Sequence, residues 1–280
     1  MIEIKIKDFD LKETLECGQF FRFYEEEQSY SIIAHGKILY ISQEKDILKL
    51  NCTEEDYENI WKSFFDIERD YGEIKDKISK GDSILQEAVK HAPGTRLLNQ
   101  DPYECLIHFI ISQNNHIPRI KKIIENLSNN FGKSIDGTNF SFPTSYDLHK
   151  ASIEEIMECR TGFRAKYIKD AVRRIETENF DPYYIKTLDE QKAREELMKI
   201  HGVGGKVSDC VLLFSMQKYS SFPTDVWVKR IMQEFYFDGK EMKIPVILEF
   251  AKEKWGDYAG FAQQYLFYYA KEKKIGKNKK

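Results

Sequence analysis

The stretch KIHGVGGKVSDCVLLF, from Lys199 to Phe214, places a glycine-rich turn between two segments with helical spacing. Its glycines are Gly202, Gly204 and Gly205. Glycine permits positive φ and lets another backbone approach closely, and the unpaired amides of such a turn suit a phosphate. The pattern indicates a helix–hairpin–helix. An ordinary pair of antiparallel helices with a glycine cap is the alternative.

A lysine, Lys206, opens the second of these segments, where the helix dipole disfavours positive charge. Apolar residues at i, i+3, i+4 and i+7 give this segment a buried face: Val207, Cys210, Val211 and Phe214. The dipole and the loss of solvent both favour the neutral, nucleophilic amine. A solvated lysine without a catalytic role is the alternative.

A carboxylate follows 19 residues later, in the stretch SFPTDVWVKRIM. Asp225 comes after a turn that contains proline and begins another predicted helix, where it serves as an N-cap. An N-cap carboxylate can also face a cleft. An amine that attacks a sugar C1′ and a carboxylate that stabilises oxocarbenium-like charge are together what displacement of a nucleobase requires.

Composition bounds the other possibilities. The chain has 280 residues, a net charge of −3, and aromatic residues at 14% of positions, which indicate a folded protein. The five cysteines are scattered without a CxxC pair or a His/Cys cluster, so we expect no metal site and no cofactor. No apolar run approaches the ~18 residues of a membrane span, and the N-terminus does not resemble a signal peptide. We therefore expect a cytoplasmic protein, associated with the nucleoid in a bacterium or archaeon, or a nuclear protein in a cell with a nucleus.

The distribution of patterns along the chain predicts an α+β fold. Residues 1–52 alternate between apolar and polar in short runs, typical of an antiparallel sheet with one covered face. Helical spacing begins after Thr53 and continues to the end of the chain. We divide the chain into an N-terminal sheet domain, residues 1–95, and a helical body, residues 96–280. The body ends in a lysine-rich tail, KEKKIGKNKK, interpreted as a solvated terminus.

Six stretches together resemble the 8-oxoguanine DNA glycosylase/AP lyase family of the helix–hairpin–helix superfamily. The two that carry the chemistry are GVGGKVSDC (202–210) and FPTD (222–225). The others are LECGQFFRF (15–23), LNQDPYECLIHFIISQNNHIPRI (98–120), TGFRAKYI (161–168) and YAGFAQQYLF (258–267). The resemblance covers nearly the whole chain. It implies a bifunctional enzyme that flips 8-oxoguanine out of duplex DNA, excises it through a Schiff base on Lys206, and cleaves the abasic site.

The resemblance also implies roles for residues that contact the DNA around the extruded nucleotide. Asn114 of the Asn-Asn turn enters the gap, and Phe163 wedges the base stack. Arg119 and Arg164 contact the orphaned cytosine, whose acceptors match their donors. Contacts to phosphate are the alternative for the two arginines.

For the base itself, the resemblance implies a pocket near the C-terminus. Gln263 reads the Watson–Crick edge, Phe267 stacks on one face of the base and Cys210 lies on the other. The backbone carbonyl of Gly18 accepts a hydrogen bond from N7 of 8-oxoguanine, where guanine has an acceptor instead. Core packing is the alternative for Phe267.

Two positions depart from the family pattern, and two other functions remain open. Trp227 stands where members often carry a histidine near the DNA backbone, and Phe163 lacks the hydroxyl of tyrosine. A glycosylase for alkylated or deaminated bases is the first alternative function, and a hairpin module that only holds DNA is the second. We expect the partner to be double-stranded DNA that contains oxidised guanine and the protein to act as a monomer, without a membrane.

Overall fold

The N-terminal strands form an antiparallel sheet in the computed structural model, which describes residues 1–273. They are β1 (Ile2–Lys5), β2 (Phe23–Glu25), β3 (Tyr30–Ala34), β4 (Lys37–Glu44) and β5 (Ile47–Asn51), in the order β1-β5-β4-β3-β2. Ile2 pairs with Leu50 and Ile4 with Leu48, so apolar side chains of neighbouring strands share one face. The antiparallel sheet expected in residues 1–52 is confirmed.

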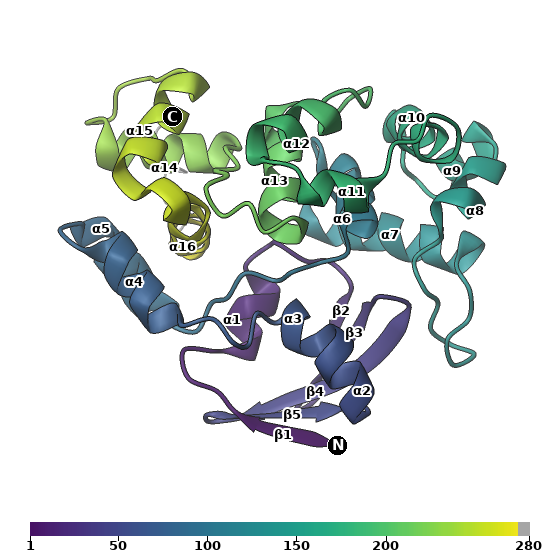
Figure 1. Ribbon diagram of the computed structural model, residues 1–280, viewed down its shortest axis with the longest axis horizontal. Coiled ribbons are helices and arrows are strands. Elements are labelled where there is room, and N and C mark those ends of the chain that lie inside the picture. Colours follow the sequence, from purple (N-terminus) through teal and green to yellow (C-terminus); the bar gives the residue numbers. More distant parts are fainter. Residues whose placement is uncertain (274–280) are drawn as a thin grey trace.

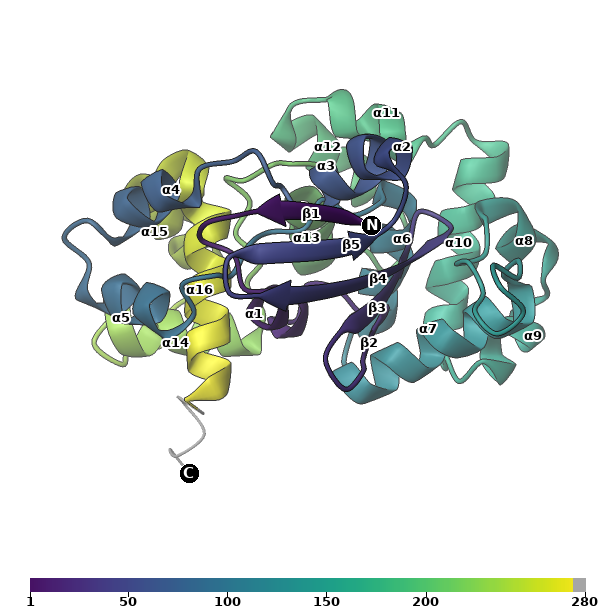
Figure 2. The same cartoon turned by 90° about the horizontal axis from the view of Figure 1, so that it is seen from below.

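One face of this sheet is covered by short helices. They are α1 (Leu11–Glu16), α2 (Glu54–Asp56), the π-helical turn η1 (Tyr57–Trp61) and α3 (Lys62–Phe64). Leu15, Trp61 and Phe64 are fully buried against the strands, where they form the sheet domain's core. Figure 1 shows α1 and α3 between the sheet and the larger helical part, and Figure 2 shows the opposite sheet face turned toward the viewer.

The next two helices, α4 (Tyr71–Ser79) and α5 (Ser83–His91), leave the sheet. Tyr71, Ile74 and Leu85 belong to the core of the helical body, and both helices pack against α16 (Ala259–Glu272) near the end of the chain. In Figures 1 and 2 they lie beside α14, α15 and α16. The predicted domain boundary at residue 95 assigns α4 and α5 to the sheet domain, whereas their side chains pack in the helical body. The boundary itself remains a prediction.

The helical body occupies the remaining described residues, up to 273, which confirms the α+β class. Its remaining helices are α6 (Pro102–Ser112), α7 (Ile117–Phe131), α8 (Ser145–Lys150), α9 (Ile153–Glu158), α10 (Arg164–Thr177), α11 (Pro182–Thr187), α12 (Glu190–Leu197), α13 (Gly205–Ser215), α14 (Val226–Tyr236), α15 (Ile244–Trp255) and the 3₁₀ turn η2 (Gly256–Tyr258). Side chains cap many of them: Asp101 accepts hydrogen bonds from the first amides of α6, and Thr144 and Ser152 complete capping boxes. The apolar α6 is central and packs against α7, α10 and α13.

Within residues 1–273, no helix is long and apolar enough to span a membrane. The five cysteines are free. The predicted basic tail lies outside the described residues from position 274 onward.

A contact between the buried Arg22 and the partly buried Glu104 joins the sheet domain to the start of α6. Arg22 is 3% exposed, its Nη1 lies 4.0 Å from Glu104 Oε2, and its Nη2 donates to the Phe140 carbonyl at 2.5 Å. Burial raises the pKa of Glu104 to about 7, although Arg22 acts to lower it. The folded protein therefore holds a proton on Glu104 at a pH where the unfolded chain, with an ordinary pKa of 4.5, has released it.

Replacement of Glu104 by glutamine should change how stability depends on pH. Between about pH 5 and pH 7 the folded wild type still holds the proton on Glu104 that the unfolded chain has released, so this group lowers the free energy of unfolding as the pH rises. Relative to wild type, Glu104→Gln should gain about 1–2 kcal/mol of unfolding free energy across that interval. Urea unfolding of both proteins at the two pH values measures the difference, in which contributions from other titrating groups cancel. A constant difference would show that Arg22 keeps Glu104 ionised throughout.

Candidate active site

A glycine turn joins α12 to α13 and forms the predicted hairpin. Gly202 has φ 83°, and a Cβ there would lie 2.4 Å from the ring of Tyr167 on α10, so only glycine fits. A Cβ on Gly204 or Gly205 would enter open space. Gly204 is the N-cap of α13 and supplies no capping side chain, so the first amides of that helix are available to an acceptor such as phosphate.

Lys206 projects from the first turn of α13 toward the end of α6. Its Nζ donates to Ser112 Oγ at 3.4 Å and lies 5.2 Å from the centre of the Phe109 ring. Ser112 Oγ itself donates to the Phe109 carbonyl at 2.8 Å, which leaves its lone pairs for the lysine. The amine lines a cavity of about 420 Å³. The other lining residues are Gly18, Phe21, Phe109, Ser112, Asn115, His116, Ile117, Pro118, Ile120, Asp225, Trp227, Phe267 and Lys271.

The predicted carboxylate reaches the same cavity. Asp225 is the N-cap of α14, and its Oδ1 accepts a hydrogen bond of 2.8 Å from the Val228 amide, which fixes its orientation. Burial raises the pKa of the Cys210 thiol to about 11, while Lys206 opposes this rise and Asp225 adds to it. The amine, the thiol and the carboxylate therefore lie within electrostatic range of one another.

A residue from the N-terminal part of the chain and one from α16 meet at the side of this cavity that the family resemblance assigns to the flipped base. Gly18, with φ 88°, lies against Phe267 of α16, since a Cβ there would be 3.2 Å from the ring. Gln263 is 4% exposed and one turn before Phe267, and its Oε1 is buried without a hydrogen-bond partner among the described residues. A buried amide oxygen without a partner is a strong candidate for ligand binding.

The residues assigned to the DNA gap also lie together. Asn114 is exposed with φ 47°, in the turn between α6 and α7. Arg164, only 2% exposed, donates to the carbonyls of Gln113 and Asn114, the latter at 2.9 Å, and its guanidinium lies 4.5 Å from the centre of the Phe163 ring. Burial and the nearby Arg119 both lower the pKa of Arg164. In the free protein, Arg164 therefore organises the turn that carries Asn114.

Sequence analysis missed several residues of the cavity. Ser112 and Asn115 lie in the stretch quoted for the Asn-Asn turn, but only the fold shows that Ser112 meets Lys206. Lys271 was counted with the basic tail, yet it lines the cavity and donates to the Glu16 carbonyl at 3.1 Å. Trp227 also lines the cavity, and this is the environment of the first departure from the family pattern.

A second cavity, of about 910 Å³, lies at the other end of α6 and contains none of the predicted residues. Asp101, Glu104 and the rings of Tyr103 and Tyr183 are in its wall. Among residues 1–273, no group of three or more His, Cys, Asp or Glu side chains could hold a metal ion. The amine cavity is therefore the one that combines a nucleophile with two of the predicted base-contacting residues, Gly18 and Phe267, whereas Cys210 and Gln263 are not among its lining residues.

Comparison with known proteins agrees with this arrangement. Residues 1–106 match the N-terminal domain of 8-oxoguanine DNA glycosylase, and residues 107–255 match the HhH-GPD superfamily of base excision DNA repair proteins. The chain belongs to the 8-oxoguanine DNA glycosylase family within that superfamily. The match of residues 1–106 to the N-terminal domain of 8-oxoguanine DNA glycosylase favours this family over the alkyl-base glycosylases considered as an alternative.

Relatives in this family align with most of this chain. A probable N-glycosylase/DNA lyase of Methanothermobacter thermautotrophicus is 33% identical over 240 residues, 78% of this chain and 74% of the relative. The Arabidopsis thaliana N-glycosylase/DNA lyase OGG1 is 34% identical, over 73% of this chain and 60% of its own. The Clostridium acetobutylicum 8-oxoguanine glycosylase/lyase, solved with duplex DNA containing cytosine opposite 8-oxoguanine, is 42% identical with a TM-score of 0.92. That match covers 98% of this chain and 99% of the solved one.

The hairpin of this family member should tolerate alanine at one glycine and not at another. Gly202→Ala places a Cβ inside the Tyr167 ring and strains a positive φ, so it should lower the free energy of unfolding by about 1–3 kcal/mol. Gly204→Ala meets nothing within 4 Å and should leave stability within about 1 kcal/mol of wild type. Thermal or urea unfolding of the two variants provides the comparison, and equal stabilities would contradict this account of the loop.

Proposed function

We propose that the chain excises 8-oxoguanine from duplex DNA and then cleaves the abasic site, with Lys206 as the nucleophile. The observation that carries the proposal is the Lys206 amine in a cavity shared with Asp225, Gly18 and Phe267. The solved relative from Clostridium acetobutylicum supports this substrate, because its duplex contained cytosine opposite 8-oxoguanine. A monomer acting on duplex DNA in the cytoplasm completes the proposal.

In the proposed reaction, the lone pair of Lys206 Nζ forms a bond to C1′ while the C1′–N9 bond breaks. The leaving base takes the electron pair of the broken C1′–N9 bond and a proton that the attacking amine gives up once it has bonded to C1′. Asp225, held by the Val228 amide, stabilises the positive charge that develops on the sugar. Expulsion of the ring oxygen gives a Schiff base, and loss of a C2′ proton then expels the 3′ phosphate. This sequence accounts for the lyase activity.

Three side chains are assigned to recognition of the flipped base. Phe267 of the cavity wall stacks on one face, Cys210 lies toward the other, and the unpartnered Oε1 of Gln263, one helical turn before Phe267, accepts from the Watson–Crick edge. On the duplex side, Asn114 and Phe163 fill and wedge the gap while Arg119 and Arg164 contact the orphaned cytosine. The amides that follow Gly202, Gly204 and Gly205 hold the DNA backbone.

Borohydride trapping tests the nucleophile. Reduction of the Schiff base should link wild-type protein covalently to a duplex that contains 8-oxoguanine opposite cytosine, and Lys206→Gln should give no adduct. Lys271→Gln is the matched control, because Lys271 lines the same cavity but its amine donates to the Glu16 carbonyl. It should be trapped like wild type. An adduct that survives in Lys206→Gln and disappears in Lys271→Gln would show that Lys271 is the nucleophile and would contradict the proposal.

The carbonyl of Gly18 should exclude undamaged guanine. 8-Oxoguanine offers an N7–H donor to this carbonyl, whereas guanine brings a second acceptor, and an unsatisfied buried polar group costs about 1–3 kcal/mol. A discrimination of about 10–100-fold follows from this contact. A duplex with 8-bromoguanine, which has bulk at C8 but an acceptor at N7, should be excised slowly in single-turnover assays. Excision as fast as that of 8-oxoguanine would mean that the enzyme recognises size at C8.

A further inference from the structure

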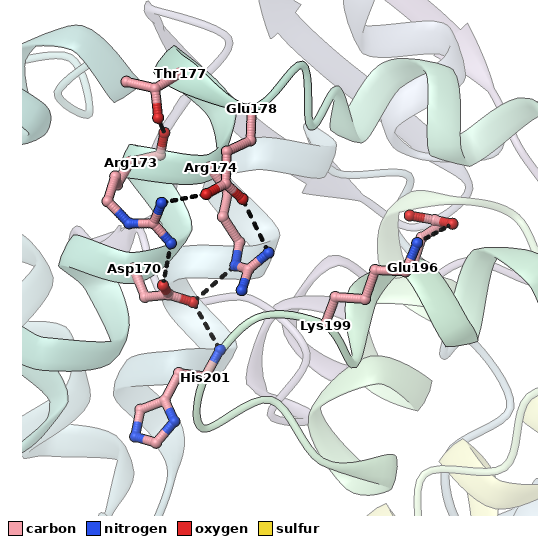
Figure 3. A network of polar contacts seen from close by, with 8 residues as sticks. All are labelled: Asp170, Arg173, Arg174, Thr177, Glu178, Glu196, Lys199 and His201. Carbon is pink, nitrogen blue, oxygen red and sulfur yellow. Dashed lines mark hydrogen bonds and ion pairs between the residues drawn. The ribbon is translucent and has the colours of Figure 1, made fainter.

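A carboxylate on the neighbouring helix holds the backbone of the hairpin turn. Asp170, in the middle of α10, accepts a hydrogen bond of 2.8 Å from the His201 amide through Oδ2 (Figure 3). The same oxygen accepts from Arg174 Nε at 2.9 Å, and Oδ1 accepts from Arg173 Nη2 at 2.8 Å. His201 directly precedes Gly202, so this contact is made at the first residue of the phosphate-binding turn.

A negative charge so close to a phosphate site would ordinarily oppose DNA binding. Here the two arginines that bind Asp170 also bind Glu178, at 3.0 Å for Arg174 Nη1 (Figure 3). Two carboxylates and two guanidinium groups give a cluster with no formal net charge. Burial acts to raise the pKa of Asp170, but the His201 amide and both arginines outweigh it and hold the pKa at about 2. The aspartate is therefore ionised and electrically compensated.

A second contact of α10 reaches the same turn from one helical turn earlier. The Tyr167 ring occupies the space that a side chain at position 202 would need, and it lies edge-on to the His201 ring at 5.1 Å between centres. Tyr167 also packs edge-on against Phe163, at 5.7 Å. Because α10 begins at Arg164, one rigid helix carries the predicted gap residues at its start and fixes the hairpin from its middle.

We propose that Asp170 is a positioning residue that sets the hairpin turn for DNA binding. It holds the His201 amide so that the amides after Gly202 and Gly204 meet the DNA backbone while Phe163 and Arg164 meet the gap. The proposal rests on the proposed function only in taking the hairpin as a DNA-binding element. It assigns Asp170 no contact with DNA and no part in the chemical step.

Hydrogen bonding and charge are separable at this position. Asp170→Asn keeps an oxygen acceptor at the same distance from the backbone but removes the charge, and its amide nitrogen can face Arg173, whose side chain is 43% exposed and remains paired with Glu178. Asp170→Glu keeps the charge and displaces the acceptor by one methylene. Asp170→Ala removes both. Glu178→Gln is the matched control, because it changes the charge of the same cluster without touching the hairpin.

The test measures dissociation constants for an undamaged duplex by fluorescence anisotropy at fixed salt, with melting temperatures and single-turnover excision at saturating protein. Positioning predicts that Asp170→Ala weakens binding about tenfold and Asp170→Glu severalfold, with Asp170→Asn and Glu178→Gln within about threefold of wild type. The excision rate at saturation should change little in all four variants.

Several results would overturn the proposal. If charge alone matters, Asp170→Asn and Asp170→Ala both bind more tightly and Asp170→Glu binds like wild type. Wild-type affinity in Asp170→Ala would show that the turn needs no support from α10. If Asp170→Ala does not fold, the other two variants decide the question: positioning predicts near wild-type affinity for Asp170→Asn and weaker binding for Asp170→Glu, whereas a pure charge effect predicts tighter binding for Asp170→Asn and wild-type affinity for Asp170→Glu. Failure of wild type to excise 8-oxoguanine would contradict the proposed function but leave the binding comparison intact.

Discussion

The arrangement of the active site depends on one buried carboxamide, that of Gln19. It is fully buried, and its Nε2 donates to the carbonyls of Thr14 and Arg96 at 2.9 and 2.7 Å while its Oε1 accepts from the Leu98 amide at 2.9 Å. Its own carbonyl accepts from Gln100 Nε2 at 2.8 Å. Loss of any of these bonds would leave a buried polar group unpaired, which is costly. The segment before the second strand is thereby fastened to the chain that leads into α6.

This fastening matters because the cavity is built from both parts of the molecule. Gly18 directly precedes Gln19 and comes with the sheet domain, whereas Lys206, Asp225 and Phe267 come from the helical body. Discrimination by a single carbonyl requires that it be held to within a fraction of an ångström, because hydrogen bonds weaken steeply with distance and angle. Gly18 has no side chain to anchor it, so its neighbour's four hydrogen bonds provide the anchorage.

Local patterns in the sequence predicted much of this protein. The alternation in residues 1–52, the glycines before Lys206 and the proline before Asp225 each depend on near neighbours, and the structure has a sheet, a turn and an N-cap at those places. Other features join segments far apart in the chain. They are the packing of α4 and α5 on α16, the hydrogen bond from Lys206 to Ser112, and the hydrogen bond from the His201 amide to Asp170. Nothing in the periodicity of one segment determines which distant segment covers it. Roles at Gly18, Gln263 and the arginines came from family resemblance rather than from physics of the residues.

A chain with a net charge of −3 that binds a polyanion must separate its charges. In the proposed mode of DNA binding the hairpin does this with neutral groups, since backbone amides attract phosphate without adding to the formal charge. The negative charge of Asp170, which supports the hairpin, is compensated by Arg173 and Arg174. Arg164 keeps its guanidinium on the carbonyls of Gln113 and Asn114, where it orders the turn before any base arrives. Preorganisation of this kind reduces the entropy lost on binding, so the protein needs fewer ionic contacts to achieve the same affinity and should depend less on salt than a basic DNA-binding surface would.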